Sequence, residues 1–143
     1  MSLEEKLGQM VVVYYWGRYA PKDDARFREV MRQVKENRLG GIMLEARRTP
    51  SGIERGQVYP SAVIVNELQR VAKIPLLVAA DFENGTAMRL AEGTSLPSAM
   101  AVAATGDPQF AYAAGKITAL EARSAGLNWI FAPVCDEIGR AHV

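Results

Sequence analysis

The sequence predicts an α/β fold in which parallel strands alternate with helices, as in part of a (β/α)8 TIM-type barrel. Four short runs are almost wholly apolar, and unbroken apolar character is typical of strands that are covered on both faces. Segments with the helical spacing of apolar residues separate these runs. No glycine-rich phosphate loop follows the first run, which favours a barrel, although the spacing also allows an open, doubly wound sheet.

The first two strands each follow a helix. Ser2 and Glu5 form the pattern of a capping box and predict a helix over residues 3–9. The apolar run 10–16 is the first expected strand, and Gly17 ends it. The second helix is expected after Pro21, with one apolar face, and two glycines end it before a strand at 42–44; that face carries Phe27, Val30, Met31 and Val34.

The middle of the chain contains the clearest strand. Residues 45–59 are polar, contain proline and glycine, and are expected to form a long loop. Pro60 is expected to begin the third helix, whose buried stripe carries Ile64, Leu68, Val71 and Ala72. The run 74–80 is apolar throughout and ends at Asp81.

The last part of the sequence repeats the alternation of helix and strand. A helical turn is expected at 95–104, and Asp107 with Pro108 is typical of a helix start. The inner face of that helix is expected to carry Phe110, Ala114 and Ile117, and Gly126 ends it. A fourth strand is expected at 127–131.

Composition excludes several classes of function. The 143 residues are 49% hydrophobic and 23% charged, with a formal net charge of +1. This balance predicts no nucleic-acid partner, and Arg47, Arg48 and Arg55 are interpreted as solvated surface. No apolar run approaches the roughly 20 residues that span a membrane, and no signal peptide precedes Met1. Cys135 has no second cysteine to pair with and is expected to be buried.

Two charged residues follow the clearest strand and are the candidate binding site. Ligand sites of parallel sheets lie beyond the carboxyl ends of the strands, where Asp81 stands. A carboxylate there can accept hydrogen bonds from two sugar hydroxyls, and Arg89 could donate to the same sugar. An equally open alternative makes Asp81 a loop cap and Arg89 its structural partner.

Other residues near strand ends could also take part in chemistry. Glu83 could form a glycosidase carboxylate pair with Asp81, but one extended segment would place the two poorly around a scissile bond. Asp136 follows the fourth strand, where a structural role is expected. Tyr14, Tyr15 and Trp16 could stack on sugars but are interpreted as core. No metal or organic cofactor is indicated.

Several segments, in order, resemble glycoside hydrolase family 3. The most characteristic is Ile74-Pro-Leu-Leu-Val-Ala-Ala-Asp81-Phe-Glu-Asn-Gly85, continuing to Met88-Arg-Leu90. The likeness extends over residues 2 to about 136. Further matching segments lie on both sides of the most characteristic one: Ser2–Met10, Gly40–Met43, Leu96–Met100, Ala103–Pro108, Glu121–Arg123 and Asn128–Val134. Asn84 departs from the glycine or arginine of many members.

The resemblance implies the first half, about four βα units, of a TIM-type barrel that hydrolyses terminal β-linked glucose or N-acetylglucosamine with retention. It implies that Asp81 binds sugar hydroxyls and, in the N-acetylglucosaminidase branch, that Arg89 does so too. The carbohydrate substrate is the expected partner. The family's Lys-His pair, aspartate nucleophile and acid/base are not found in the sequence.

The resemblance ends near residue 136, and residues 137–143 look like a translated sequencing adapter. His142, the sole histidine, then has no chemical role. We therefore expect the chain to be a truncated, inactive fragment. Two other classes stay open: a complete α/β module that binds a small ligand, and a barrel enzyme of different chemistry, such as a lyase or aldolase.

Overall fold

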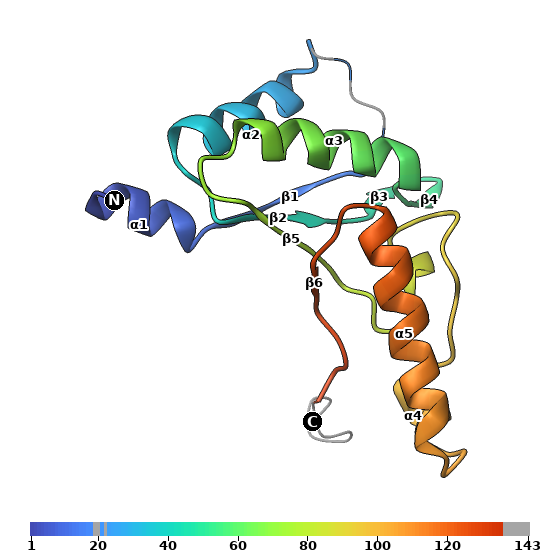
Figure 1. Cartoon of the computed structure of the whole chain (residues 1–143). Helices are drawn as coiled ribbons and strands as arrows, with labels where there is room; N and C mark the ends of the chain where they lie inside the picture. Colours follow the sequence, from blue (N-terminus) through green and yellow to red (C-terminus); the bar gives the residue numbers. More distant parts are fainter. Residues whose placement is uncertain (19–20, 22, 136–143) are drawn as a thin grey trace, which may run out of the picture.

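A computed structural model describes residues 1–18, 21 and 23–135. Its main sheet has four parallel strands in the order β1, β2, β5 and β6 (Figure 1). These strands span Val12–Tyr15, Gly41–Leu44, Leu77–Ala80 and Trp129–Ile130. Strands β1, β5 and β6 lie within their predicted ranges and are shorter than them, whereas β2 begins one residue before its predicted range.

Two helices begin at the predicted capping residues Ser2 and Asp107, and Asp24 caps a third that was expected after Pro21. Helix α1 (Leu3–Gln9) has the full Ser2–Glu5 capping box, and Asp24 and Asp107 cap α2 (Ala25–Glu36) and α5 (Pro108–Ser124). Helix α3 spans Val58–Val71, and the shorter α4 and η1 span Ala99–Ala103 and Thr86–Met88.

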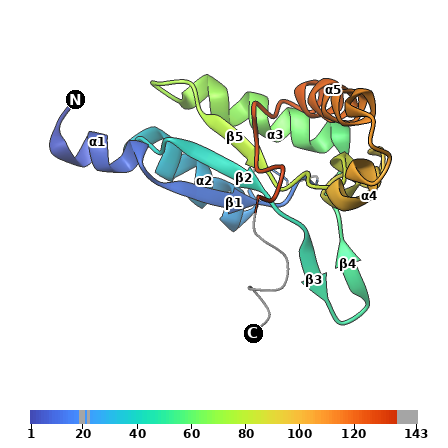
Figure 2. The same ribbon diagram turned by 90° about the horizontal axis from the view of Figure 1, so that it is seen from below.

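The strand order and the placement of the helices decide between the two architectures. The main-sheet strands lie side by side in chain order, and α2 and α3 lie on the same side of the sheet (Figure 2). Ala122 of α5 belongs to the same buried cluster as Leu68 of α3, so α5 covers that side too. A doubly wound sheet has helices on both faces and a reversal of strand order. The fold is therefore part of a (β/α)8 barrel.

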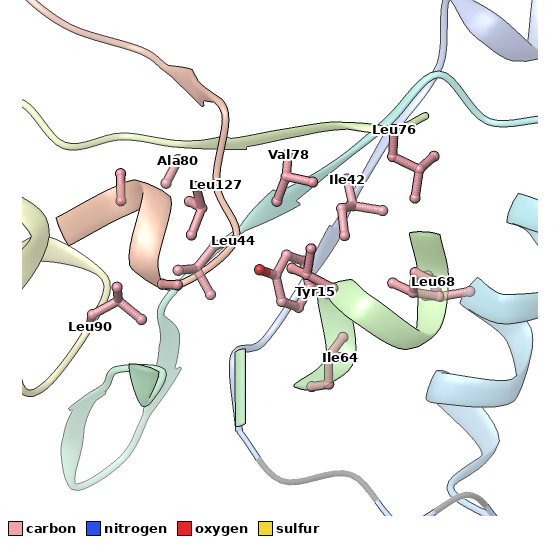
Figure 3. Close-up of a cluster of buried hydrophobic side chains, with 14 of the residues drawn as sticks. Tyr15, Ile42, Leu44, Ile64, Leu68, Leu76, Val78, Ala80, Leu90 and Leu127 are labelled. Carbon is pink, nitrogen blue, oxygen red and sulfur yellow. The ribbon is translucent and has the colours of Figure 1, made fainter. Parts of the chain in front are cut away.

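The core fills the space between the sheet and these helices (Figure 3). The strand residues that point into it are in register: Tyr15 is level with Leu44 and Ala80, and Ile42 is level with Val78. Leu68 of α3 packs against them and is fully buried. The predicted apolar stripes of α2 and α3 are confirmed by the burial of Val30, Val34, Ile64 and Leu68.

The opposite face of the sheet is uncovered, contrary to the prediction that both faces of each strand are covered. Leu77 is 48% exposed, whereas its neighbour Val78 is 0% exposed. Val12 and Tyr14 on β1 and Trp129 on β6 are exposed as well. Successive strand side chains point to opposite faces, so this open face is the side that lines the interior of a barrel.

The expected loop at 45–59 is instead mostly ordered. Strands β3 (Arg47–Thr49) and β4 (Gly52–Glu54) form an antiparallel hairpin, and α3 begins at Val58 rather than Pro60. Proline fits the first turn of a helix because the N–H it lacks would have no intrahelical partner. The Val58 N–H donates to the Glu92 carboxylate at 3.2 Å, a cap that the local sequence does not reveal.

Two burial predictions near the C-terminal part are wrong. Phe110 and Ile117 are exposed, and α5 instead buries Thr118 and Ala122. Small residues let this helix pack closely, so its large apolar side chains face outward. Cys135 is exposed rather than buried. Asp136, His142 and the expected tail 137–143 lie outside the described residues. Over the described ranges, none of the helices has the length and apolar character needed to cross a membrane.

The uncovered face predicts the behaviour of the 143-residue chain in solution. Because β1 and β6 leave open strand edges beside an exposed apolar surface, we expect the chain to self-associate and to unfold without a sharp transition. Size-exclusion chromatography and thermal melting followed by circular dichroism measure both properties. A monomer with one cooperative transition would contradict this expectation.

Two adjacent substitutions test the assignment of the faces. Leu77→Gln should reduce aggregation, because it places a polar group on the open face. Val78→Gln should increase aggregation, because it buries an amide in the core at a cost of about 1–3 kcal/mol. Light scattering at equal protein concentration compares the two variants. Equal effects would show that the faces are assigned wrongly.

Candidate functional site

The two predicted site residues meet at the carboxyl end of the sheet. Asp81 directly follows β5, and Arg89 follows η1 eight residues later. Arg89 Nη2 donates to Asp81 Oδ2 at 2.6 Å. The Arg89 side chain is only 16% exposed. This ion pair agrees with both predicted roles, sugar binding and structural support, since either requires the two groups to be adjacent.

Backbone hydrogen bonds fix the position of Arg89. Its N–H donates to the Thr86 carbonyl at 3.1 Å, and its own carbonyl accepts from Gly56 N–H at 2.8 Å. Gly85 begins this turn at φ 85°, a conformation that glycine adopts without strain. Gly56 also accepts from the Ala91 N–H, so the segment after β4 and the loop after η1 support each other.

Glu121 on α5 ties the same loop to a long helix. Its carboxylate accepts hydrogen bonds from the Thr86 hydroxyl, the Thr94 hydroxyl and, at 3.0 Å, the Thr94 N–H. These bonds, led by that from Thr86, lower the pKa of the Glu121 carboxyl below its ordinary 4.5. Thr86 is fully buried, so the contact anchors the interior of the loop.

A second carboxylate beside Arg89 was not predicted. Glu45 Oε1 lies 3.0 Å from Arg89 Nε, but this N–H is not directed at the oxygen and makes no hydrogen bond to a described residue. The contact is therefore an ion pair without a hydrogen bond. The signal was present in the sequence: Glu45 follows β2 as Asp81 follows β5. Only the pairing of these strands shows that the two residues are neighbours.

Glu83 does not join this cluster. Its side chain is exposed, and it forms no ion pair with any residue that the structure describes. The idea that Asp81 and Glu83 are a catalytic pair therefore gains no support from the geometry.

The aromatic residues of β1 have two different environments. Tyr15 is buried, and its hydroxyl lies 2.9 Å from the Ser61 hydroxyl, as expected of a core residue. Tyr14 is half-exposed, which corrects its assignment to the core. The Arg26 guanidinium lies 4.5 Å from the Tyr14 ring centre and 4.2 Å from that of Trp16. A cation therefore already covers these rings.

A separate cavity lies away from these residues. A space of about 630 Å³ between α4, α5 and the segments after β5 and β6 is lined mainly by apolar groups and includes neither Asp81 nor Arg89. Sugar recognition requires convergent hydrogen-bonding groups. The Asp81–Arg89 cluster offers them, whereas the lining of this cavity is mainly apolar. We therefore place the candidate site at the cluster.

The cluster suits the binding of a polar, uncharged ligand. Asp81 Oδ2 is engaged by Arg89, whereas Asp81 Oδ1 has no hydrogen-bond donor among the described residues and is available to a hydroxyl. Within the described ranges, no group of three or more His, Cys, Asp or Glu side chains could hold a metal ion.

Comparison with known proteins identifies the family. The sequence model of the glycosyl hydrolase family 3 N terminal domain matches residues 2–141. The chain belongs to glycoside hydrolase family 3. The family resemblance inferred from the sequence is thereby confirmed.

Family 3 relatives cover nearly the whole chain. A β-N-acetylglucosaminidase/β-glucosidase of Cellulomonas fimi is 33% identical over 136 residues, which are 95% of this chain. The solved family 3 β-N-acetylglucosaminidase of Paenibacillus sp. str. FPU-7 is 33% identical over 93% of the chain, with a TM-score of 0.73. The solved β-glucoside phosphorylase BglX bound to 2FGlc is 29% identical over 95%, with a TM-score of 0.76.

The chain is much shorter than these family 3 proteins. It spans 21% of the Cellulomonas protein, 24% of the Paenibacillus chain and 22% of the phosphorylase chain. Its four βα units align with the TIM-barrel-like part of the solved relatives.

The contacts of Glu121 predict that its removal loosens the loop that carries Arg89. In Glu121→Gln, the side chain has a single neutral oxygen, which cannot accept all three hydrogen bonds that the carboxylate accepts. Hydrogen exchange at residues 86–94 should accelerate about 5-fold to 100-fold, since bonds to charged acceptors contribute about 1–3 kcal/mol. Glu67→Gln is the control, because the ion pair that Glu67 forms among the described residues is with Arg70, on the surface of α3. Unchanged exchange in Glu121→Gln would contradict the anchoring role.

Acid should have the same effect as this substitution. A carboxyl whose folded-state pKa is lowered stabilises the fold above its unfolded pKa, and this stabilisation is lost as the pH falls through the folded-state pKa. Protection of the loop should therefore persist at pH 4.5 and be lost only below it. A carbon-13 NMR titration of the Glu121 carboxyl should show a midpoint below 4.5. A midpoint above 4.5 would contradict the hydrogen bonding described here.

Proposed function

We propose that the full-length protein from which this chain derives hydrolyses terminal β-linked glycosides of glucose or N-acetylglucosamine, with retention of configuration. Asp81 accepts hydrogen bonds from hydroxyls of the terminal sugar, and Arg89 orients that carboxylate and donates to the same sugar. The observation that carries the proposal is the Asp81–Arg89 pair at the carboxyl end of the sheet, which leaves one carboxylate oxygen available.

Membership of the family supports the choice of sugars. The Cellulomonas relative is a β-N-acetylglucosaminidase/β-glucosidase, and a relative from Methylobacillus flagellatus, 30% identical over 115 residues, is a β-hexosaminidase. Terminal sugars of this kind are uncharged and rich in hydroxyls. A carboxylate acceptor beside an arginine donor matches that chemistry.

The proposal gives the reacting groups to other parts of the full-length protein. Retention requires a nucleophilic carboxylate and an acid/base group about 5 Å apart. Asp81 is engaged by Arg89, and Glu83 is exposed and forms no ion pair with a described residue. We therefore assign Asp81 to substrate binding. The nucleophile and the acid/base are assigned to segments of the full-length protein that this chain does not contain.

Phosphorolysis is the second candidate, because BglX is a β-glucoside phosphorylase and is 29% identical over 95% of the chain. In that reaction phosphate replaces water as the group that accepts the glycosyl unit. The two reactions are separated by the product: hydrolysis releases free sugar without phosphate, whereas phosphorolysis requires phosphate and releases a sugar phosphate.

Substitution of Asp81 tests its role as a sugar ligand. In the full-length protein, Asp81→Asn should lower kcat/KM for nitrophenyl β-glycosides about 10-fold to 1,000-fold, because a charge-assisted acceptor becomes a neutral amide. Asp107→Asn is the matched control, since asparagine caps a helix as well as aspartate. Unaltered kinetics in a folded Asp81→Asn protein would show that Asp81 is structural.

The 143-residue chain should not turn over these glycosides by itself. The expected result is hydrolysis no faster than the buffer background, measured by release of nitrophenol over several hours. Robust turnover by the purified chain, free of host glycosidases, would contradict the assignment of the reacting groups to other segments.

A further inference from the structure

The end of β2 carries a carboxylate that the proposed function does not yet use. Strands β2 and β5 are hydrogen-bonded neighbours, and Leu44 is level with Ala80. Glu45 and Asp81 are therefore the next residues of adjacent strands, which run about 4.8 Å apart. The Glu45 N–H still donates to the Tyr15 carbonyl at 2.9 Å, so its backbone is held in the sheet.

The two oxygens of Glu45 have different environments. Oε1 accepts from the Ala46 N–H at 2.8 Å and lies 3.0 Å from Arg89 Nε. Oε2 accepts no hydrogen bond from the residues that the structure describes. The Glu45 side chain is 35% exposed. Glu45 therefore offers one carboxylate oxygen without a hydrogen bond, on a partly exposed side chain that shares Arg89 with Asp81.

Arg89 connects the two carboxylates without satisfying both. It donates a hydrogen bond to Asp81, whereas its buried Nε is not aligned with Glu45. A site that served only to hold the fold together would be expected to align this bond, since a buried donor without an acceptor costs free energy. The loose contact leaves Glu45 able to turn toward a ligand.

We propose that Glu45 is a second sugar-binding carboxylate, which accepts a hydrogen bond from a ring hydroxyl adjacent to the one bound by Asp81. This inference rests on the proposed function and deepens it. Arg89 between the two carboxylates keeps them close together despite their like charges. The pair makes the site specific for a sugar with two neighbouring free hydroxyls, because a missing hydroxyl leaves a carboxylate unpaired.

The test is a double-mutant cycle in the full-length protein, in which one change removes the Glu45 carboxylate and the other removes a single hydroxyl of the substrate. Glu45→Gln is assayed on nitrophenyl β-glycosides that each lack one ring hydroxyl. For the intact sugar, kcat/KM should fall about 10-fold to 100-fold, as expected for a hydrogen bond to a charged group. For one deoxy substrate, Glu45→Gln and the unmodified protein should be equal within about 2-fold.

The matched control is Glu54→Gln. Glu54 is also 35% exposed and also pairs with an arginine, Arg18, but it lies on the hairpin strand β4. The effect of Glu54→Gln on kcat/KM should be the same for the intact sugar and for every deoxy substrate. Asp81→Asn should couple to a hydroxyl adjacent to the one that couples to Glu45.

Each other outcome has a distinct meaning. If Glu45→Gln lowers kcat/KM equally for the intact sugar and for every deoxy substrate, Glu45 acts only through Arg89 and the inference is overturned. The inference is also overturned if Glu45→Gln lowers kcat/KM for none of the substrates. If Glu45→Gln melts at a lower temperature, Glu45→Asp provides the test instead, because it keeps the charge but moves the carboxylate away from the sugar. This variant must then lose activity on the intact sugar but not on the same single deoxy substrate. If the unmodified protein cleaves none of the glycosides, or Asp81→Asn is fully active, the proposed function itself fails.

Discussion

The in-register parallel pairing of β2 with β5 is the constraint on which the site depends. Because Leu44 and Ala80 are level, both strands end at the same height, and the next residue of each is a carboxylate. Arg89 can reach both only because its loop is fixed at Thr86, at Gly56 and, through Thr86 and Thr94, at Glu121. A shift of one residue in the register would turn these side chains to opposite faces of the sheet.

The same sheet explains why the chain has two different surfaces. One face packs against α2, α3 and α5 and contains fully buried residues such as Ile42 and Val78. The other exposes Leu77, Tyr14 and Trp129, although parallel sheets are normally covered on both faces. In a closed barrel these side chains would fill the interior in layers. The chain spans only about a fifth to a third of the curated relatives that it matches, in agreement with this interpretation.

The fold could be predicted from sequence where a signal is local. Capping residues such as Ser2 and Asp107 fix helix starts through bonds to nearby backbone N–H groups, and four apolar runs locate the strands. The hairpin at 47–54 was missed because its strands are short and polar. The buried face of α5 was misjudged because small residues pack there, whereas periodicity analysis follows the large apolar ones.

Part of the site could be predicted because its signal, too, is local in the sequence. Asp81 and Arg89 lie eight residues apart, and both the strand end and the family resemblance indicate them. Glu45 lies 36 positions before Asp81 and becomes its neighbour only through strand pairing, which single-sequence periodicity does not determine. Glu121 likewise contacts Thr86 across 35 residues. Long-range contacts of this kind complete a site whose first members are visible locally.

The central claim is that the carboxylate after β5 holds a sugar. A crystal structure of the full-length protein with a bound glucose or N-acetylglucosamine product tests it most directly. We predict that Asp81 Oδ1 accepts a hydrogen bond of about 2.5–3.0 Å from a ring hydroxyl, with Arg89 still paired to Oδ2. A sugar bound elsewhere, with Asp81 in contact only with protein groups, would contradict the account.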